Sequence, residues 1–173
     1  MVEKRSPGVP GSPSPGGIGY DFPLEPSETK CAITGVNGFL ARHLAFQLLA
    51  KGYHVVGTVR FDVNDMNRVE ASMPYYQTWN QIFQNRFTLH QVNLIQEETM
   101  YDAFKGCYCV FHTASPILLP KEPSTEEEAE EMYYKPAVEG TKHVLQACEY
   151  CEVDRVVITS STYALYNPFN PPR

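Results

Sequence analysis

The sequence predicts an α/β protein built on a doubly wound parallel sheet of five strands in the order 3-2-1-4-5. Two observations carry this prediction. Five short apolar runs that suit buried strands alternate with helical segments, and the first run leads through a glycine-rich turn into a helix. In such a sheet the ligand crevice lies at the carboxyl ends of strands one and four, where the strand order reverses. A binding site is therefore expected there.

The first strand, turn and helix begin in residues 30–41, Lys-Cys-Ala-Ile-Thr-Gly-Val-Asn-Gly-Phe-Leu-Ala. Gly35 permits a tight turn, and Gly38 lets the backbone approach a pyrophosphate at the helix N-terminus. An ordinary strand-to-helix turn can carry the same glycine pair. The phosphate loop is favoured by a helix end at Lys51-Gly52 and by one apolar helix face, formed by Leu40, Ala41, Leu44, Ala45, Leu48 and Leu49.

Length and composition indicate one domain. The chain has 173 residues, of which 43% are hydrophobic and 20% are charged, and its net charge is -6. The acidic balance and the lack of a basic cluster argue against a nucleic-acid partner. No run of about 18 apolar residues predicts a membrane span, and no apolar segment after Lys4 and Arg5 suggests a secretory signal. The expected location is the cytoplasm.

The N-terminal segment differs from the rest. Residues 1–28 are crowded with Pro, Gly and Ser, so a disordered tail is expected there, followed by an incomplete nucleotide-binding domain over residues 29–173. The spacings Cys107-x-Cys109 and Cys148-x-x-Cys151 suggest metal or disulfide chemistry. However, these cysteines fall on an apolar strand and an apolar helix face, so we expect neither.

The second strand, residues 53–60, ends in Arg60. In dinucleotide folds the residue at this position meets the adenosine ribose, and an acid there would bind the free 2′-hydroxyl of NAD. A guanidinium suits a 2′-phosphate instead, which favours NADP. Arg68 could reach the same phosphate. Two alternatives stay open: Arg60 is a solvated surface side chain, or Asp62 allows NAD.

The next segments are a helix, a strand, a short helix and a fourth strand. Residues 64–85 predict a helix with Trp79, Ile82 and Phe83 in the core, and residues 86–94 a strand that brings Asn93 to the adenine. Residues 99–105 predict a short helix and residues 108–112 the fourth strand.

The fourth strand ends at a histidine and a turn of small residues. The turn, Thr113-Ala114-Ser115-Pro116, would let the ribose and nicotinamide pass close to the backbone. His112 is either a catalytic base or a core histidine whose hydrogen bonds are satisfied. The second interpretation is favoured, because histidines at buried strand ends usually have that role.

A long helix and a fifth strand complete the pattern. Glutamates over residues 126–131 predict a helix start, with a capping box of either Ser124 and Glu127 or Thr125 and Glu128. Pro136 should interrupt or kink this helix, and Gly140 should approach the sheet. The expected packed stripe is Ala137, Val138, Thr141, Val144, Leu145 and Cys148. The fifth strand, residues 155–161, ends at Ser161 beside the expected crevice.

Six motifs in this order resemble the extended short-chain dehydrogenase/reductase family, and within it the branch of dihydroflavonol 4-reductases and cinnamoyl-CoA reductases. The resemblance covers about residues 29–166. Ala41, where many members have Gly, and Asn93, where Asp is usual, depart from the family pattern. The motifs occupy residues 34–41, 57–60, 103–107, 110–116, 136–141 and 155–161.

The resemblance implies a Rossmann-like fold that binds NADPH and passes its hydride to a small-molecule carbonyl, with Ser, Tyr and Lys as catalytic groups. The Ser corresponds to Ser161, which would polarise the carbonyl. No metal is implied. The candidate cofactor-binding residues are Thr34, Gly35, Asn37, Gly38, Phe39, Leu40, Arg60, Asn93, Leu94, Thr113, Ala114 and Ser115.

In the family the Tyr and Lys follow the Ser by some thirty residues or more, and this chain stops at Arg173. Tyr101 and Lys105 have the right spacing, but they fall on a helix outside the sheet. Tyr163 and Tyr166 have no lysine four residues later. We therefore expect this form to hold NADP(H) weakly or not at all and to be an inefficient reductase.

Two other functions stay open. One is a non-catalytic NADP-binding or regulatory module that forms a homo-oligomer or pairs with a full-length relative through an uncovered fifth strand. The other is an NAD-dependent epimerase/dehydratase or a hydroxysteroid dehydrogenase of the same fold. Arg60 and the turn at residues 111–116 rank these two enzymes lower.

Overall fold

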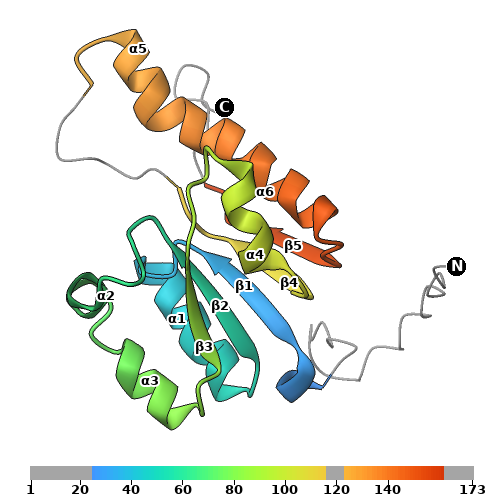
Figure 1. The fold of residues 1–173 in the computed structure, drawn as a ribbon. Coiled ribbons are helices and arrows are strands. Elements are labelled where there is room, and N and C mark those ends of the chain that lie inside the picture. Colours follow the sequence, from blue (N-terminus) through green and yellow to red (C-terminus); the bar gives the residue numbers. More distant parts are fainter. Residues whose placement is uncertain (1–24, 116–122, 162–173) are drawn as a thin grey trace, which may run out of the picture.

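The computed structural model describes residues 25–115 and 123–161, which form a parallel sheet with helices on both faces (Figure 1). The strand order is β3-β2-β1-β4-β5, and all four strand pairings are parallel. The predicted fold class and strand order are confirmed. The strands are β1 (Lys30–Thr34), β2 (His54–Val59), β3 (Phe87–Gln91), β4 (Cys109–His112) and β5 (Arg155–Ile158).

The helices form two layers. One layer comprises α1 (Phe39–Ala50), α2 (Met66–Ser72) and α3 (Tyr76–Ile82). The other comprises η2 (Glu97–Met100), α4 (Tyr101–Phe104), and the continuous succession of α5 (Glu126–Ala129), η3 (Glu130–Glu139) and α6 (Gly140–Tyr150). Figure 1 shows α5 at the far end of this succession, projecting away from the sheet. In the described part of the chain, no helix has the length and apolar character to cross a membrane.

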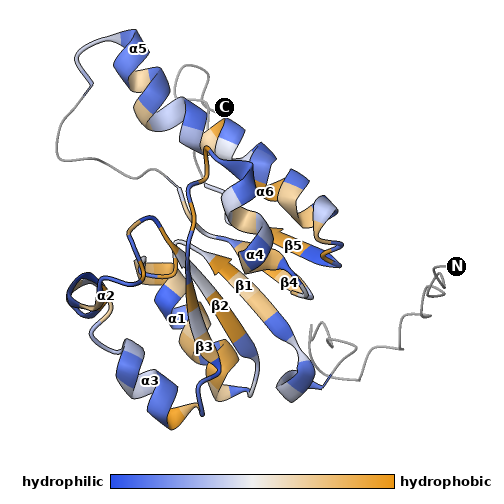
Figure 2. Cartoon of the chain, viewed as in Figure 1, coloured by the Kyte–Doolittle hydropathy of each residue, from blue (hydrophilic) through white to orange (hydrophobic). Residues whose placement is uncertain are grey.

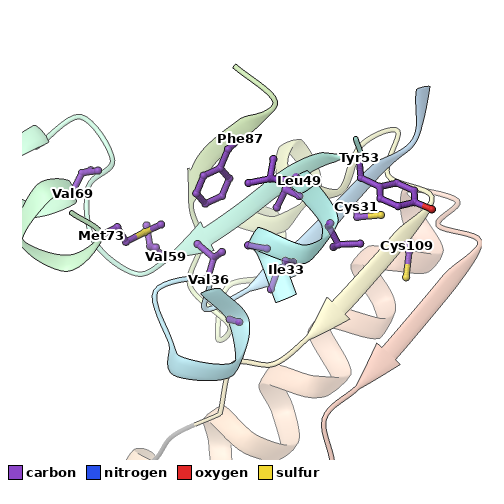
Figure 3. Packing of buried hydrophobic residues seen from close by; sticks show 14 of the residues in the cluster. Cys31, Ile33, Val36, Leu49, Tyr53, Val59, Val69, Met73, Phe87 and Cys109 are labelled. Atoms are coloured by element: carbon purple, nitrogen blue, oxygen red, sulfur yellow. The ribbon is translucent and has the colours of Figure 1, made fainter. Parts of the chain in front are cut away.

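Alternate residues of the central strands supply two cores, one on each face of the sheet. Cys31 and Ile33 pack toward α1, whereas Ala32 packs toward α4 and α6. Figure 3 shows the first core, where Ile33 and Val36 lie among side chains of β2, α1 and β3. Figure 2 shows apolar residues along β1 and β2 and mainly polar residues on α5.

Four residues that the sequence placed in the core are exposed instead. Leu40 is 54% exposed, Ile82 63% and Leu145 43%, and Ala137 also faces solvent. Residues 64–85 form two short helices, so Ile82 ends α3 and leaves Trp79 to pack on the core. Leu40 lies in the first turn of α1. Helical spacing identifies an apolar stripe, but it does not show which part of that stripe the core covers: Leu40 and Ile82 lie at helix ends, and Leu145 lies in the middle of α6.

The segment just before β1 is ordered, unlike the expectation for residues 1–28. Pro26–Glu28 form a single 3-10 turn, η1. The Thr29 hydroxyl donates to the Glu25 carbonyl at 2.8 Å, and the His54 ring contacts the Ser27 carbonyl at 3.1 Å. The expected disorder is therefore wrong for residues 25–28, and residues 1–24 lie outside the described part.

Helix α5 begins at a capping arrangement around Thr125. Its hydroxyl accepts from the Glu128 amide at 3.1 Å, while the Glu128 carboxylate accepts from the Ser124 amide at 2.7 Å. Of the two predicted boxes, the Thr125–Glu128 pair forms. Pro136 neither ends nor interrupts the helix, because the backbone around it widens into a π-helix over Glu130–Glu139. The wider turn accommodates a ring that has no N–H to donate.

Gly140 makes a close approach, but to a loop rather than to a strand. A Cβ at Gly140 would lie 2.9 Å from the Leu94 Cβ, in the segment after β3. The prediction that Gly140 approaches the sheet is therefore wrong, because its partner is the loop after β3. The absent side chain brings the long helix against the loop that carries Asn93 and Leu94.

All five cysteines fall in the described residues, and none is in a disulfide. Burial raises the pKa of Cys31, Cys107 and Cys148 to about 12, and that of Cys109 to about 11. Thiolate is the reactive form of cysteine. These four side chains therefore act as small apolar groups.

Candidate cofactor-binding site

A cleft of about 720 Å³ lies where β1, β2, β3 and β4 reach their carboxyl ends. The turn after β1, the end of β2, the loop after β3, the turn after β4 and the π-helix η3 form its walls. The residues that line it are Gly35, Asn37, Gly38, Thr58, Val59, Arg60, Phe61, Arg68, Val92, Asn93, Leu94, Ile95, Thr113, Ala114, Ser115, Met132 and Pro136.

The turn after β1 is compact because two glycines form it. Gly35 has a left-handed φ of +65°, and a Cβ there would lie 3.0 Å from the Ala114 Cβ and 3.2 Å from its Cα. Gly38 donates from its amide to the Gly35 carbonyl at 2.9 Å and precedes α1 without a side-chain cap. The first turn of α1 contains no acidic residue. An uncapped helix N-terminus favours an anionic group.

Two cations line the cleft beside the end of β2. Arg60 directly follows the strand, and Arg68 of α2 lies with its Cζ 5.4 Å from the Phe61 ring centroid. Asp62 is absent from the lining, and its carboxylate accepts from the Asn64 amide at 2.9 Å in a local turn. None of the described residues that line the cleft is acidic. This end of the cleft is therefore positively charged.

The loop after β3 forms the opposite wall. The Asn93 amide donates to the Thr99 hydroxyl at 3.0 Å, and the Asn93 side-chain oxygen accepts from the Ile95 amide at 3.2 Å. These bonds fix the conformation of the loop, and Leu94 lies against Gly140 of the long helix. Asn93 therefore shapes this wall through its own hydrogen bonds.

The turn after β4 is fastened to β1 by Thr34. Its side chain is fully buried, and its hydroxyl accepts from the Thr113 amide at 3.1 Å and from the Ala114 amide at 3.0 Å. The same oxygen lies 2.8 Å from His112 Nδ1. His112 is 3% exposed, and burial lowers its pKa. It is a core histidine with hydrogen bonds on both ring nitrogens, as the sequence favoured.

Most of the predicted cofactor-binding residues lie together in this cleft, and three do not. Thr34 is buried behind the wall. Phe39 and Leu40 are 73% and 54% exposed on the first turn of α1, where the Phe39 ring lies 5.2 Å from the Arg42 guanidinium. The predicted residues in the lining are Gly35, Asn37, Gly38, Arg60, Asn93, Leu94, Thr113, Ala114 and Ser115.

Sequence reasoning did not assign several lining residues to the site. Thr58, Val59 and Phe61 flank Arg60, and Val92 and Ile95 flank Asn93, so proximity to those residues was an available signal. Pro136 opens the family motif at residues 136–141, which gave it no place in the site, and Met132 offered no signal; the path of the long helix brings both to the cleft.

The catalytic candidate Ser161 follows β5 and is exposed, outside the cleft lining. It comes three residues after Ile158, whose strand pairs with β4, and the Thr159 amide continues that ladder to the His112 carbonyl at 3.0 Å. Ser161 therefore follows the strand that neighbours the turn at residues 113–115.

Tyr101, the tyrosine of the pair with Lys105, has a structural role. The Tyr101 hydroxyl donates to the Glu97 carboxylate at 2.7 Å, and its ring lies 4.4 Å from the Tyr150 ring. The hydrogen bond to Glu97 is the main cause that raises the pKa of Tyr101 to about 12. A phenol activated for proton transfer would need the opposite shift. Tyr163 and Tyr166 lie outside the described residues.

Two curated proteins similar to this chain are reductases. A tetraketide alpha-pyrone reductase of Arabidopsis thaliana is 36% identical over 86% of this chain and 43% of its own length. A cinnamoyl-CoA reductase of Medicago truncatula is 36% identical over 84% of this chain and 38% of its own length. The chain thus spans less than half the length of these relatives. They confirm the resemblance to this branch of reductases.

Solved structures agree with the fold. The structure of the yeast methylglyoxal/isovaleraldehyde reductase complexed with NADPH aligns with a TM-score of 0.61 at 26% identity. The alignment covers 82% of this chain and 39% of that one. The family model for the 3-beta hydroxysteroid dehydrogenase/isomerase family matches residues 32–170. The chain therefore belongs to the 3-beta hydroxysteroid dehydrogenase/isomerase family.

Proposed function

We propose that the cleft binds NADP(H) and that this chain supplies the cofactor-binding portion of a carbonyl reductase. The observation that carries the proposal is that Arg60 and Arg68 line the same cleft as the glycine turn at Gly35 and Gly38. A dinucleotide carries a diphosphate that suits the turn, and only the phosphorylated form carries a second anionic group for the arginines.

Each wall has a distinct part in holding the cofactor. The backbone at Gly38 and the N-terminus of α1 would hold the diphosphate, since no side chain caps that helix. Arg60 and Arg68 would bind the 2′-phosphate with charge-assisted hydrogen bonds. Thr113, Ala114 and Ser115 would lie along the ribose and nicotinamide. When bound, NADPH would supply a hydride for a carbonyl substrate.

Ser161 is the proposed catalytic residue of this chain. Its hydroxyl would donate a hydrogen bond to the substrate carbonyl oxygen, making the carbonyl carbon a better hydride acceptor. Its place after β5, which pairs with β4, supports this role. The reductase names of the relatives support the same class of reaction. The carbonyl substrate is proposed only as a class, an aldehyde or ketone.

The cofactor proposal is tested by titrating the chain with NADPH and with NADH, following nucleotide fluorescence. NADPH should bind more tightly than NADH. Arg60→Ala should weaken NADPH binding about 10- to 100-fold, since a hydrogen bond to a charged group contributes about 1.5–3 kcal/mol, and should leave NADH affinity nearly unchanged.

The matched control is Lys51→Ala. It removes one positive charge at the other end of α1, outside the cleft. This variant should bind NADPH like the parent chain, apart from a small general charge effect that salt screens. Equal losses in the two variants would show that overall charge, rather than Arg60, governs affinity. Tighter binding of NADH would contradict the preference for NADP.

A further inference from the structure

A chain of hydrogen bonds that begins in the core connects two walls of the cleft. It starts at Thr34 at the end of β1, passes through His112 at the end of β4, and reaches Thr141 in α6. His112 Nε2 lies 3.1 Å from the Thr141 hydroxyl, which in turn donates to the Ala137 carbonyl at 2.6 Å. Ala137 lies in η3, next to the lining residue Pro136.

The bonds around Thr34 determine where its proton lies. A hydroxyl has one proton to donate and two lone pairs to accept with. The Thr34 oxygen already accepts from two backbone amides, those of Thr113 and Ala114. Its proton is therefore left for His112 Nδ1, which lies 2.8 Å away and must be an acceptor.

The other ring nitrogen follows from the same reasoning. With Nδ1 as an acceptor, neutral His112 carries its proton on Nε2. That proton is donated to the Thr141 oxygen, whose own proton goes to the Ala137 carbonyl. Each polar hydrogen of this hydrogen-bond network then has one acceptor. The tautomer is assigned by its partners.

We propose that His112 is a positioning residue, held in the Nε2–H form between Thr34 and Thr141, that sets the spacing of the turn at residues 113–115 and the wall at Pro136. This inference rests on the proposed function, because it concerns the shape of the nucleotide cleft. His112 does not line the cleft and is 3% exposed, so it acts only through its two partners.

Thr34 has a second link that strengthens this role. Its backbone carbonyl accepts from the Thr113 hydroxyl at 2.6 Å, so main chain and side chain both hold the turn. Gly35, the next residue, packs against Ala114. A shift of the turn would therefore narrow or widen the place where the glycine turn meets the wall after β4.

The tautomer is tested directly by ¹⁵N NMR of the imidazole at neutral pH, without nucleotide. The expected spectrum has a protonated Nε2 and an unprotonated Nδ1 for His112, with hydrogen-bond couplings toward Thr34 and Thr141. A proton on Nδ1 would overturn the assignment.

The positioning role is tested with two matched pairs of variants. Thr34→Val and Thr141→Val remove a hydroxyl at nearly constant volume, and Thr34→Ser and Thr141→Ser retain it. Thr88→Val is the control, because Thr88 is an exposed threonine on β3. Hydrogen exchange at the Thr113 and Ala114 amides should accelerate about tenfold in Thr34→Val and less in Thr141→Val. The serine variants and Thr88→Val should exchange like the parent chain.

NADPH affinity gives the functional measurement. It should fall about tenfold in Thr34→Val and about threefold in Thr141→Val, and should recover with serine. Unchanged affinity in both valine variants would overturn the positioning role. If Thr34→Val does not fold, Thr141→Val decides, since Thr141 is linked to the turn at residues 113–115 only through His112. If the parent chain binds no nucleotide, the proposed function fails, and the tautomer and exchange rates still decide whether the network holds the turn.

Discussion

At the carboxyl end of the sheet Arg60 follows β2 beside an open cleft, whereas at the amino end Arg86 and Arg155 are bonded within the protein. Arg86 donates to the Gly52 carbonyl at 2.9 Å, and Arg155 donates to the Tyr108 hydroxyl at 3.0 Å. Within the described residues, the Arg60 side chain has no hydrogen bond or ion pair. At the amino end of the sheet, Arg86 and Arg155 therefore stabilise the fold. At the carboxyl end, Arg60 is available to a ligand.

The glycines at the two ends differ in the same way. Gly35 and Gly106 both have a left-handed φ, +65° and +71° respectively. A Cβ at Gly35 would meet Ala114 at 3.0 Å, whereas a Cβ at Gly106 would meet nothing within 4 Å. Gly106 is thus required only for the conformation of its own turn. Gly35 also allows two walls of the cleft to come into contact.

The largest expected effect comes from Gly35→Ala compared with Gly106→Ala. Both substitutions place a Cβ in a left-handed conformation, at a cost of about 1–2 kcal/mol. Only Gly35→Ala adds a clash with Ala114, which should raise the loss to about 2–5 kcal/mol and abolish NADPH binding. Urea unfolding and nucleotide titration measure the two effects. Equal stability losses and intact binding in both variants would show that the contact with Ala114 is unimportant.

Acid should destabilise the chain through His112. Burial lowers the pKa of this group in the folded state, so the unfolded chain takes up the proton first as the pH falls below the ordinary value of 6.5. The contribution of His112 to stability is thus complete above that pH and declines below it, by at most about 1.4 kcal/mol per pH unit.

The measurement is urea unfolding at pH 7.5, 6.5 and 5.5 on the parent chain and on His112→Asn. Carboxyl groups titrate alike in both, so their difference isolates the histidine. A variant that loses stability toward pH 5.5 as steeply as the parent chain would contradict this prediction.

Arg86→Met should lower stability without changing NADPH affinity. The variant keeps most of the side-chain length but removes the donor to the Gly52 carbonyl, so a loss of about 0.5–1.5 kcal/mol is expected. Urea unfolding and nucleotide titration of this variant are compared with those of Arg60→Ala. Arg60→Ala is expected to lower NADPH affinity without lowering stability. A loss of NADPH affinity in Arg86→Met would remove the functional distinction between the two ends.

The smallest effect is expected for Tyr101→Phe, which should leave nucleotide binding unchanged. Its hydroxyl bonds to Glu97 outside the cleft. The ultraviolet difference titration between parent chain and variant should show a phenol that ionises with a pKa of about 12. A midpoint below 10 would instead indicate an activated tyrosine and would restore the pair with Lys105 as a catalytic candidate.

The sequence predicted the parts of this protein that depend on local pattern. Apolar runs predicted five strands and their order, and the glycine pair predicted the turn before α1. Arg60 was predicted to end a strand at the crevice, and the structure places it in the cleft lining. These inferences succeed because strand alternation, glycine conformation and the position of a residue at a strand end are properties of short segments.

The tertiary structure decided which segments meet and which faces are covered. Thr34 and His112 are 78 residues apart, and strand pairing brings them together. Met132 and Pro136 line the cleft on the long helix, which packs with Gly140 against Leu94. Leu40 and Ile82 carry apolar side chains on helix ends that the sheet does not cover. Contacts of this kind depend on how whole helices and strands are placed relative to one another. The hydrophobic period of a single helix does not predict that placement.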